Sequence, residues 1–416
     1  MRNFKFQSLK EKFFDFNKLN FYISCILIFL LPITKKIIPI LIVMLIITFL
    51  RKINLKKINF YFSKKNFLEK STFFLIILFY IFHIIGMFYT EHLSTGFFDL
   101  EVKLSIFIFP ILFFFSSSIY KKNIKIILNY FILGNFFSVI SILFYGFFRY
   151  LKYENINFLF YADLSIFHHP SYFAMYLTFC IAIIFYLLNK KIFLIFPKYF
   201  YVFCFFLFTI TLYLLSSKAG ILIAFIISFL NFFIYKNEFL NKKQKFLFIF
   251  FILFFYIFAF TQNYRIKKLD KDLKVKKEEI IKKEKNSASR LLIWESAFVL
   301  IKENFFFGVG TGDIKSEIFK VYKSKKMKHQ LEKKLNVHNQ FLETFVGQGF
   351  FNFLILIILF LISLKDIFIK RKFLNLSFLI IIGINFLFES MLNSQAGVVF
   401  FAFFYSFLNF IYDDKI

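Results

Sequence analysis

The residues of this sequence that could do chemistry are polar side chains at the ends of long apolar runs. Lys218 joins two such runs, Arg290 follows a stretch of mixed charge, and His338 and Asn339 precede a further run. Polar groups beside apolar spans are costly to desolvate, which makes them functional candidates. An arginine fork suits a diphosphate, a lysine offers a point charge, and a histidine can take a proton from a hydroxyl group.

Two further candidates also stand at the ends of apolar runs, His169 in FHHPSY and Glu389 in FLFES. Each candidate has an ordinary structural interpretation as well. Lys218 could simply extend to the membrane surface, and Arg290 could form an ion pair with a loop carboxylate. His338 could be a hydrogen-bonded surface residue. Two adjacent histidines do not make a metal site without further ligands, so no metal is expected.

The glycine-rich segment GVGTGD at 308–313 has some likeness to a nucleotide-binding loop. Such a loop follows a β-strand and opens a βαβ unit. No strand is predicted before this segment, so a nucleotide site is rejected. The glycines instead let the chain turn sharply after a helix that carries Trp294.

Membrane-spanning helices must position these residues. Of the 416 residues, 59% are apolar and 24% aromatic, and the mean hydropathy is +0.70. Long Phe, Ile and Leu runs predict an all-α polytopic membrane protein rather than a β-barrel. A soluble enzyme, a secreted disulfide scaffold and a disordered chain are excluded. The three cysteines lie in apolar runs without metal-ligand spacing.

Apolar runs bounded by charge predict about twelve helices. They cover residues 20–33, 37–50, 72–88, 104–119, 126–148, 170–188, 199–216, 219–235, 246–260, 346–364, 374–390 and 396–411. Three parts follow from this order, namely an N-terminal membrane bundle of about nine spans (1–260), a long, largely helical loop (261–345) and a C-terminal bundle of about three spans (346–416).

Lysines and arginines concentrate in alternate short connections, which predicts that those connections face the cytoplasm. Both termini are then cytoplasmic, and residues 261–345 form a periplasmic loop in which 264–285 has the spacing of an amphipathic helix. No cleaved signal peptide is expected. The formal charge of +29 is discounted, because heavy use of Lys, Phe, Ile and Asn is typical of AT-rich coding DNA. No nucleic-acid partner is expected.

The predicted topology places the five charged or titratable candidates on one outer face. These are Lys218, Arg290, His338, His169 and Glu389. Cation, base and acid can therefore meet in one outer cleft.

Taken together, the later motifs resemble the O-antigen ligase family, bacterial polytopic proteins that share a domain with O-antigen polymerases. The resemblance rests on SSKAG at 216–220, SRLLIWESAFVLIKENFFFGVGTGD at 289–313 and VHNQFLETFVGQGFFNFL at 337–354. HHPSYFAMYL at 168–177 and ESMLNSQAGVVFFAFF at 389–404 look like the versions common in Bacteroidetes. The likeness covers roughly residues 160–405.

The resemblance implies a metal-independent, inverting glycosyltransferase of the bacterial inner membrane that needs no cofactor. Such a protein moves a preassembled glycan from undecaprenyl diphosphate, among membrane lipids, to an acceptor hydroxyl such as that of lipid A core. By motif position, Arg290 and Lys218 would bind the diphosphate and His338 would be the catalytic base. Asn339 and His169 would support the site, as would Glu389.

Two departures and three alternatives accompany the resemblance. Lys218 stands where the family usually has arginine, and Phe305 where it usually has proline. Lysine offers a point charge where arginine offers a bidentate fork, which implies weaker diphosphate binding. The motifs do not separate a ligase from an O-antigen polymerase or from a protein O-oligosaccharyltransferase. A polytopic transporter or flippase predicts paired charges at the membrane midplane instead.

Overall fold

The helices of the structure follow the apolar runs of the sequence. This computed structural model describes residues 16–52, 62–115, 118–193, 195–234, 254, 256, 257, 261, 286–370 and 372–412. The regular elements in those ranges are all helical. They are α2 (Phe16–Leu30), α3 (Ile38–Lys52), α5 (Phe67–Ile85), α6 (Leu93–Lys103), α7 (Ser105–Phe114), α8 (Ser118–Lys122), α9 (Ile124–Tyr153), η2 (Ile156–Leu159), α10 (Tyr161–Leu164), α11 (Pro170–Asn189), α12 (Lys198–Leu214), α13 (Lys218–Ile234), α16 (Asn286–Glu303), α17 (Ile314–Ser324), α18 (Lys328–Glu332), α19 (Gln340–Lys370), α20 (Phe373–Phe388), η4 (Met391–Asn393) and α21 (Gln395–Phe410).

Four of the described helices, α5, α9, α11 and α19, are long and apolar enough to cross a membrane. Six shorter apolar helices accompany them, namely α2, α3, α12, α13, α20 and α21. A helix satisfies its backbone hydrogen bonds internally, which suits it to hydrocarbon. The chain is therefore an all-helical membrane protein over its described part, while the count of twelve spans and their orientation stay predictions.

Most of the predicted spans coincide, in whole or in part, with a described helix. The predicted span at 246–260 lies mostly outside the described residues, and the predicted amphipathic helix at 264–285 lies wholly outside them. At 104–119 the helix α7 is shorter than predicted and follows a separate helix, α6. Lys103 at the end of α6 is buried and forms an ion pair with Asp99.

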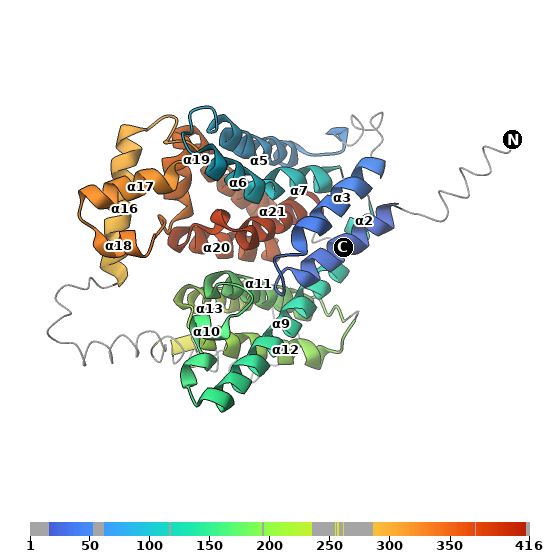
Figure 1. The fold of residues 1–416 in the computed structure, drawn as a ribbon. Coiled ribbons are helices and arrows are strands. Elements are labelled where there is room, and N and C mark those ends of the chain that lie inside the picture. The colour runs from blue at the N-terminus through green and yellow to red at the C-terminus, as the bar shows by residue number, and fades with distance from the viewer. Residues whose placement is uncertain are drawn as a thin grey trace.

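The central helices α11 and α21 join the early and late parts of the chain in one core. α21 packs against α7 and α20, and α11 packs against α13 and α20 (Figure 1). The Phe404 ring of α21 lies edge to face with Phe131 of α9 and Phe179 of α11, with centroids 4.9 and 4.7 Å apart. Aromatic pairs favour this geometry, so the phenylalanine-rich sequence packs by shape as well as by apolar area.

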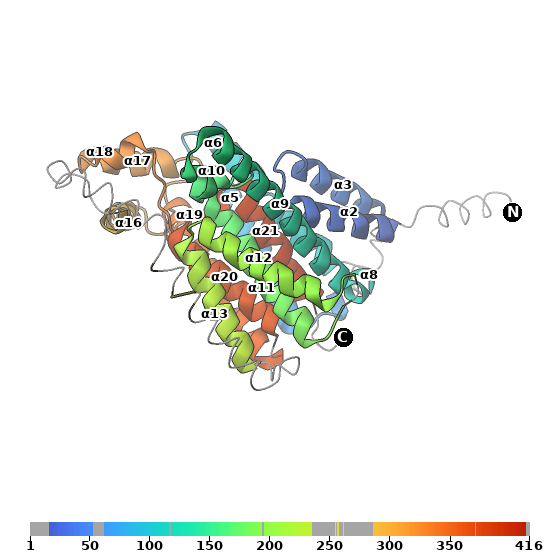
Figure 2. The same ribbon diagram turned by 90° about the horizontal axis from the view of Figure 1, so that it is seen from below.

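A second, smaller core holds α16, α17 and α18 together beside one end of the larger bundle (Figures 1 and 2). Its buried residues include Ile293 and Ala297 of α16, Ile318 and Tyr322 of α17, and Val337 in the loop before α19. α16 and α17 both pack against α19. The loop residue Val337 is thereby fixed in a packed interior. The division at 260 and 345 stays a prediction.

Helix α19 begins at Gln340, six residues before the predicted span at 346–364. Its first turns are polar, and partners from other loops satisfy Gln340 and Glu343, which lets the helix start in a segment that is not apolar. Inside α19 the backbone breaks at Gly349, where φ is 72° and ψ is −168°. A Cβ at this position would lie 2.2 Å from the Phe306 carbonyl oxygen, so the break requires glycine.

The glycine-rich residues 308–313 dock on the turn between α5 and α6. Gly312 approaches so closely that a Cβ would lie 2.4 Å from the His92 carbonyl oxygen. The Asp313 carboxylate accepts hydrogen bonds from the backbone N–H groups of Glu91 at 2.7 Å and His92 at 2.9 Å. It also lies 2.6 Å from His92 Nδ1. The glycines therefore serve a close contact between backbones.

Candidate functional site

Three of the candidate residues come together where α16, α19 and α20 meet. Arg290 lies in the first turns of α16, His338 in the loop before α19, and Glu389 at the residue that ends α20. Both α16 and α20 pack against α19. This packing brings together side chains that are far apart in the sequence.

His338 and Glu389 form a hydrogen-bonded pair. His338 Nδ1 lies 3.0 Å from Glu389 Oε2, and the two side chains are 24% and 20% exposed. A carboxylate can only accept, so the imidazole donates from Nδ1 and its neutral form keeps the lone pair on Nε2. The pair therefore fixes the tautomer in which Nε2 can accept a proton.

Arg290 and Ser171 complete this cluster around the other carboxylate oxygen. Arg290 Nη2 lies 3.8 Å from Glu389 Oε1, and its guanidinium carbon is 5.9 Å from the centroid of the Phe388 ring. Ser171 Oγ donates to the same Oε1 at 3.4 Å. The expected ion pair of Arg290 with a carboxylate is thus present. A guanidinium carries five N–H donors, so one ion pair leaves much of its fork able to bind an anion.

The charges around Glu389 keep it ionised. Burial by itself raises the pKa of this carboxyl, but the hydrogen bond from His338 and the positive charges of His338, Arg290 and His169 lower it more. The net effect is a pKa below the ordinary value of 4.5. Glu389 is therefore a carboxylate at neutral pH and stabilises a positive charge on His338.

The backbone at His338 is held in an unusual conformation. Its φ of 50° lies in the left-handed region, which is uncommon for a residue other than glycine. The backbone N–H of His338 donates to Asn336 Oδ1 at 3.2 Å, and the carbonyl of the preceding Val337 accepts from Trp294 Nε1 at 3.2 Å. These contacts fix the direction in which the imidazole leaves the chain.

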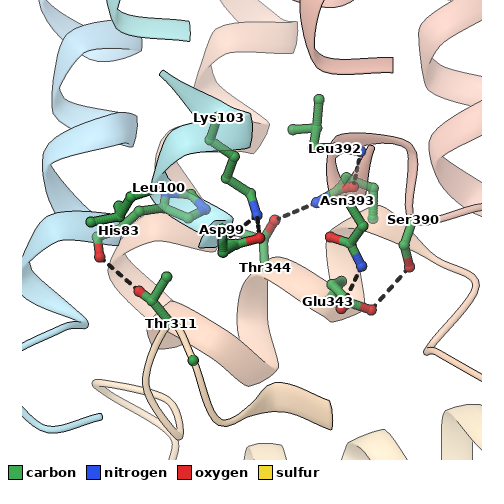
Figure 3. A network of polar contacts seen from close by, with 12 residues as sticks. His83, Asp99, Leu100, Lys103, Thr311, Glu343, Thr344, Ser390, Leu392 and Asn393 are labelled. Carbon is green, nitrogen blue, oxygen red and sulfur yellow. Dashed lines mark hydrogen bonds and ion pairs between the residues drawn. The ribbon is translucent and has the colours of Figure 1, made fainter. Parts of the chain in front are cut away.

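Glu343, which the sequence interpretation missed, is bonded to chain neighbours of the pair and is only 3% exposed. Its carboxylate accepts from Ser390 Oγ at 2.9 Å and from Asn393 Nδ2 at 2.8 Å (Figure 3). It also accepts from the Val337 N–H at 3.3 Å. A signal was available, because a single carboxylate in the run FLETFV is costly to bury without partners.

The other candidates lie at nearby helix ends. Asn339 accepts from the Leu342 N–H at 3.0 Å and donates to the Leu387 carbonyl at 3.3 Å, which ties the start of α19 to the end of α20. His169 is the N-cap of α11, and its Nδ1 accepts from the Ser171 N–H at 3.4 Å.

Lys218 is the exposed first residue of α13. Two residues later, a Cβ at Gly220 would lie 2.8 Å from the Cβ of Ala174 in the first turns of α11. The start of α13 is thus beside the start of α11, which carries Ser171. Across the ranges described, no three His, Cys, Asp or Glu side chains are grouped closely enough to hold a metal ion.

The structure is that of a membrane protein, because several of its helices can cross a membrane. A basic, an acidic and an imidazole side chain gather at helix ends and form a polar site outside the apolar core. A family model described as O-antigen ligase matches residues 203–357, a range that contains Lys218, Arg290 and His338. This match confirms the resemblance of the region to the O-antigen ligase family. No curated protein matches the chain.

Proposed function

We propose that this chain transfers a preassembled glycan from undecaprenyl diphosphate to an acceptor hydroxyl, that of lipid A core, at the periplasmic face of the bacterial inner membrane. The observation that carries the proposal is the cluster of His338, Glu389 and Arg290, in which a carboxylate orients an imidazole beside a guanidinium. The match of residues 203–357 to the O-antigen ligase family model supports the reaction class.

The proposed reaction is one displacement at the anomeric carbon of the donor. His338 Nε2 takes the proton of the acceptor hydroxyl while its oxygen forms the new bond to the anomeric carbon. The bond between that carbon and the diphosphate breaks on the opposite side, and undecaprenyl diphosphate leaves with the electron pair. The configuration at the carbon is inverted. Glu389 stabilises the imidazolium that forms, because it stays ionised beside it.

The cations act on the leaving group in this proposal. Arg290 binds the diphosphate, and its positive charge stabilises the negative charge that develops as the glycosidic bond breaks. Lys218 supplies a second charge from the start of α13. In this proposal these two side chains, rather than a metal ion, stabilise the developing charge.

The direct test is turnover by the purified protein in lipid nanodiscs with an undecaprenyl-diphosphate-linked glycan and lipid A core. We expect the core lipid to gain the glycan in a single transfer. Lengthening of the lipid-linked glycan with no transfer to core would identify a polymerase instead. Transfer to neither acceptor, with movement of the lipid-linked glycan across the bilayer, would replace the proposal with a flippase.

The proposed orientation has its own test. In a variant without the native cysteines, a single cysteine replaces the exposed Ser324 on α17. We expect an impermeant maleimide to label it in cells whose outer membrane alone has been opened. Labelling only after the inner membrane is also opened would put α17 in the cytoplasm and remove the periplasmic site.

A further inference from the structure

The His338 and Glu389 side chains sit on two separate loops, and something must hold these loops at hydrogen-bonding distance. One is the loop that ends at Asn339 before α19, and the other is the turn between α20 and α21 that contains η4. The paired residues are 51 positions apart in the sequence. A misplacement of about 1 Å at a reacting group can cost about 10²-fold in rate. The contacts that hold the two loops in place therefore affect the rate of the reaction.

Glu343 is bonded to the chain neighbours of both members of the pair. Val337, whose N–H donates to the Glu343 carboxylate at 3.3 Å, directly precedes His338. Ser390, whose hydroxyl donates at 2.9 Å, directly follows Glu389. Asn393 adds a third bond from the same turn, at 2.8 Å. One buried carboxylate thus spans the two loops.

Neighbouring contacts strengthen this bridge. The Gln340 side chain, one turn earlier on α19, accepts from the Leu392 N–H at 2.7 Å and donates to Thr344 Oγ1 at 3.3 Å (Figure 3). Trp294 Nε1 donates to the carbonyl oxygen of Val337. Val337 is therefore held through both its N–H and its carbonyl, directly before the left-handed backbone of His338.

We propose that Glu343 is a positioning residue, which sets the distance between the base and its carboxylate by joining their two loops. The proposal rests on the proposed function, since it assumes that His338 is the base. An ionised carboxylate has only acceptor sites and can take all three donors at once. A glutamine would turn its NH₂ group toward one of those donors, and an alanine would leave all three without their acceptor.

The test compares Glu343→Ala and Glu343→Gln with the parent in the nanodisc assay, with kcat, KM for the donor and melting temperature measured for each. We expect kcat to fall about 10- to 100-fold in Glu343→Ala and less in Glu343→Gln, because misplacement of the base slows chemistry. KM for the donor should stay within about twofold, because Arg290 is left in place. The matched control is Glu332→Ala, an exposed acid in the same segment, which should match the parent.

A double variant separates positioning from general stability. If Glu343 acts through His338, the Glu343→Ala substitution should cost nothing more in a His338→Ala background, because residues that act as a unit are not additive. Equal losses in both backgrounds would overturn the proposal, as would a parental kcat in Glu343→Ala. Should Glu343→Ala fail to accumulate, Glu343→Gln and Ser390→Ala carry the same test, and parental kcat in both would overturn it.

The outcome is also distinct from failure of the proposed function. A parental rate in His338→Ala would remove the base and with it the proposed mechanism. A parental rate in Glu343→Ala beside a slow His338→Ala would remove only the positioning role.

Discussion

The described part of the chain contains two histidine–carboxylate pairs, and their surroundings differ. In the pair of His92 and Asp313, the carboxylate also accepts two backbone N–H groups from the same turn. In the pair of His338 and Glu389, the further contacts are the side chains of Ser171 and Arg290, which come from two other helices. The Asp313 carboxylate is thus bonded to backbone N–H groups, whereas the Glu389 carboxylate is next to side chains that can bind a ligand or react.

This difference shows why a histidine next to an acid does not by itself mark a reactive site. Asp313 fastens residues 308–313 to the turn between α5 and α6, so its pair is part of the fold. Glu389 has a guanidinium beside it and an imidazole whose Nε2 is left as acceptor. The surrounding groups, rather than the pair alone, distinguish a structural contact from a candidate base.

The largest expected effect comes from the same substitution at both pairs. His338→Ala should lose roughly 10² to 10⁴ in transfer rate, the usual contribution of a general base. His92→Ala should keep the parental rate, and so should His329→Ala, an exposed histidine of α18. Initial rates of glycan transfer in nanodiscs measure this. Equal losses in His338→Ala and His92→Ala would erase the contrast between the pairs.

The cation beside Glu389 is the next point of difference. Arg290→Ala should weaken use of the diphosphate donor by about 10- to 100-fold in kcat/KM, because a hydrogen bond to a charged group contributes about 1.5–3 kcal/mol. Lys218→Arg should stay active, since arginine keeps the charge and offers a planar, bidentate fork of donors. Donor titrations of both variants are the measurement. Unchanged donor use in Arg290→Ala would leave this arginine as a structural ion-pair residue.

At the other pair, the effect should be on stability. Asp313→Ala removes the acceptor of the Glu91 and His92 N–H groups, which should cost about 1–3 kcal/mol in the free energy of unfolding. Thermal unfolding in detergent would show a lower Tm, with parental transfer rates at low temperature. Glu317→Ala, which breaks the surface pair with Lys320, should change stability by at most about 1 kcal/mol. A slow but fully stable Asp313→Ala would contradict this assignment.

The smallest effect is the pH dependence of that stability. Burial raises the pKa of Asp313, but hydrogen bonds from Glu91 and His92 and the charge of His92 lower it further, so the folded pKa lies below the ordinary 3.8. A lowered folded pKa gives stability that is complete above the ordinary pKa and is lost as pH falls through the folded value. The Tm difference between parent and Asp313→Ala should therefore shrink at acid pH. A Tm difference that grew on acidification would show that folding raises the pKa of Asp313 and would contradict this prediction.

Much of the helical framework was predictable from local sequence. The ends of the predicted runs 170–188 and 396–411 lie within one residue of the ends of α11 (Pro170–Asn189) and α21 (Gln395–Phe410). Pro170 and Ser394 mark the two starts, because proline suits the first turn and a serine side chain caps it. The candidates Arg290, His338 and Glu389 also stood out, since polar groups at the ends of apolar runs are costly to desolvate.

What the sequence by itself determined was therefore the class of protein, a resemblance to one family and a set of polar residues at helix ends. Tertiary structure alone decided which of them touch, and it added Glu343. Helix ends follow from neighbours a few residues away, whereas Glu389 meets His338 across 51 residues and Ser390 meets Glu343 across 47. Such contacts depend on how α16, α19 and α20 pack, and no local pattern of residues encodes that arrangement.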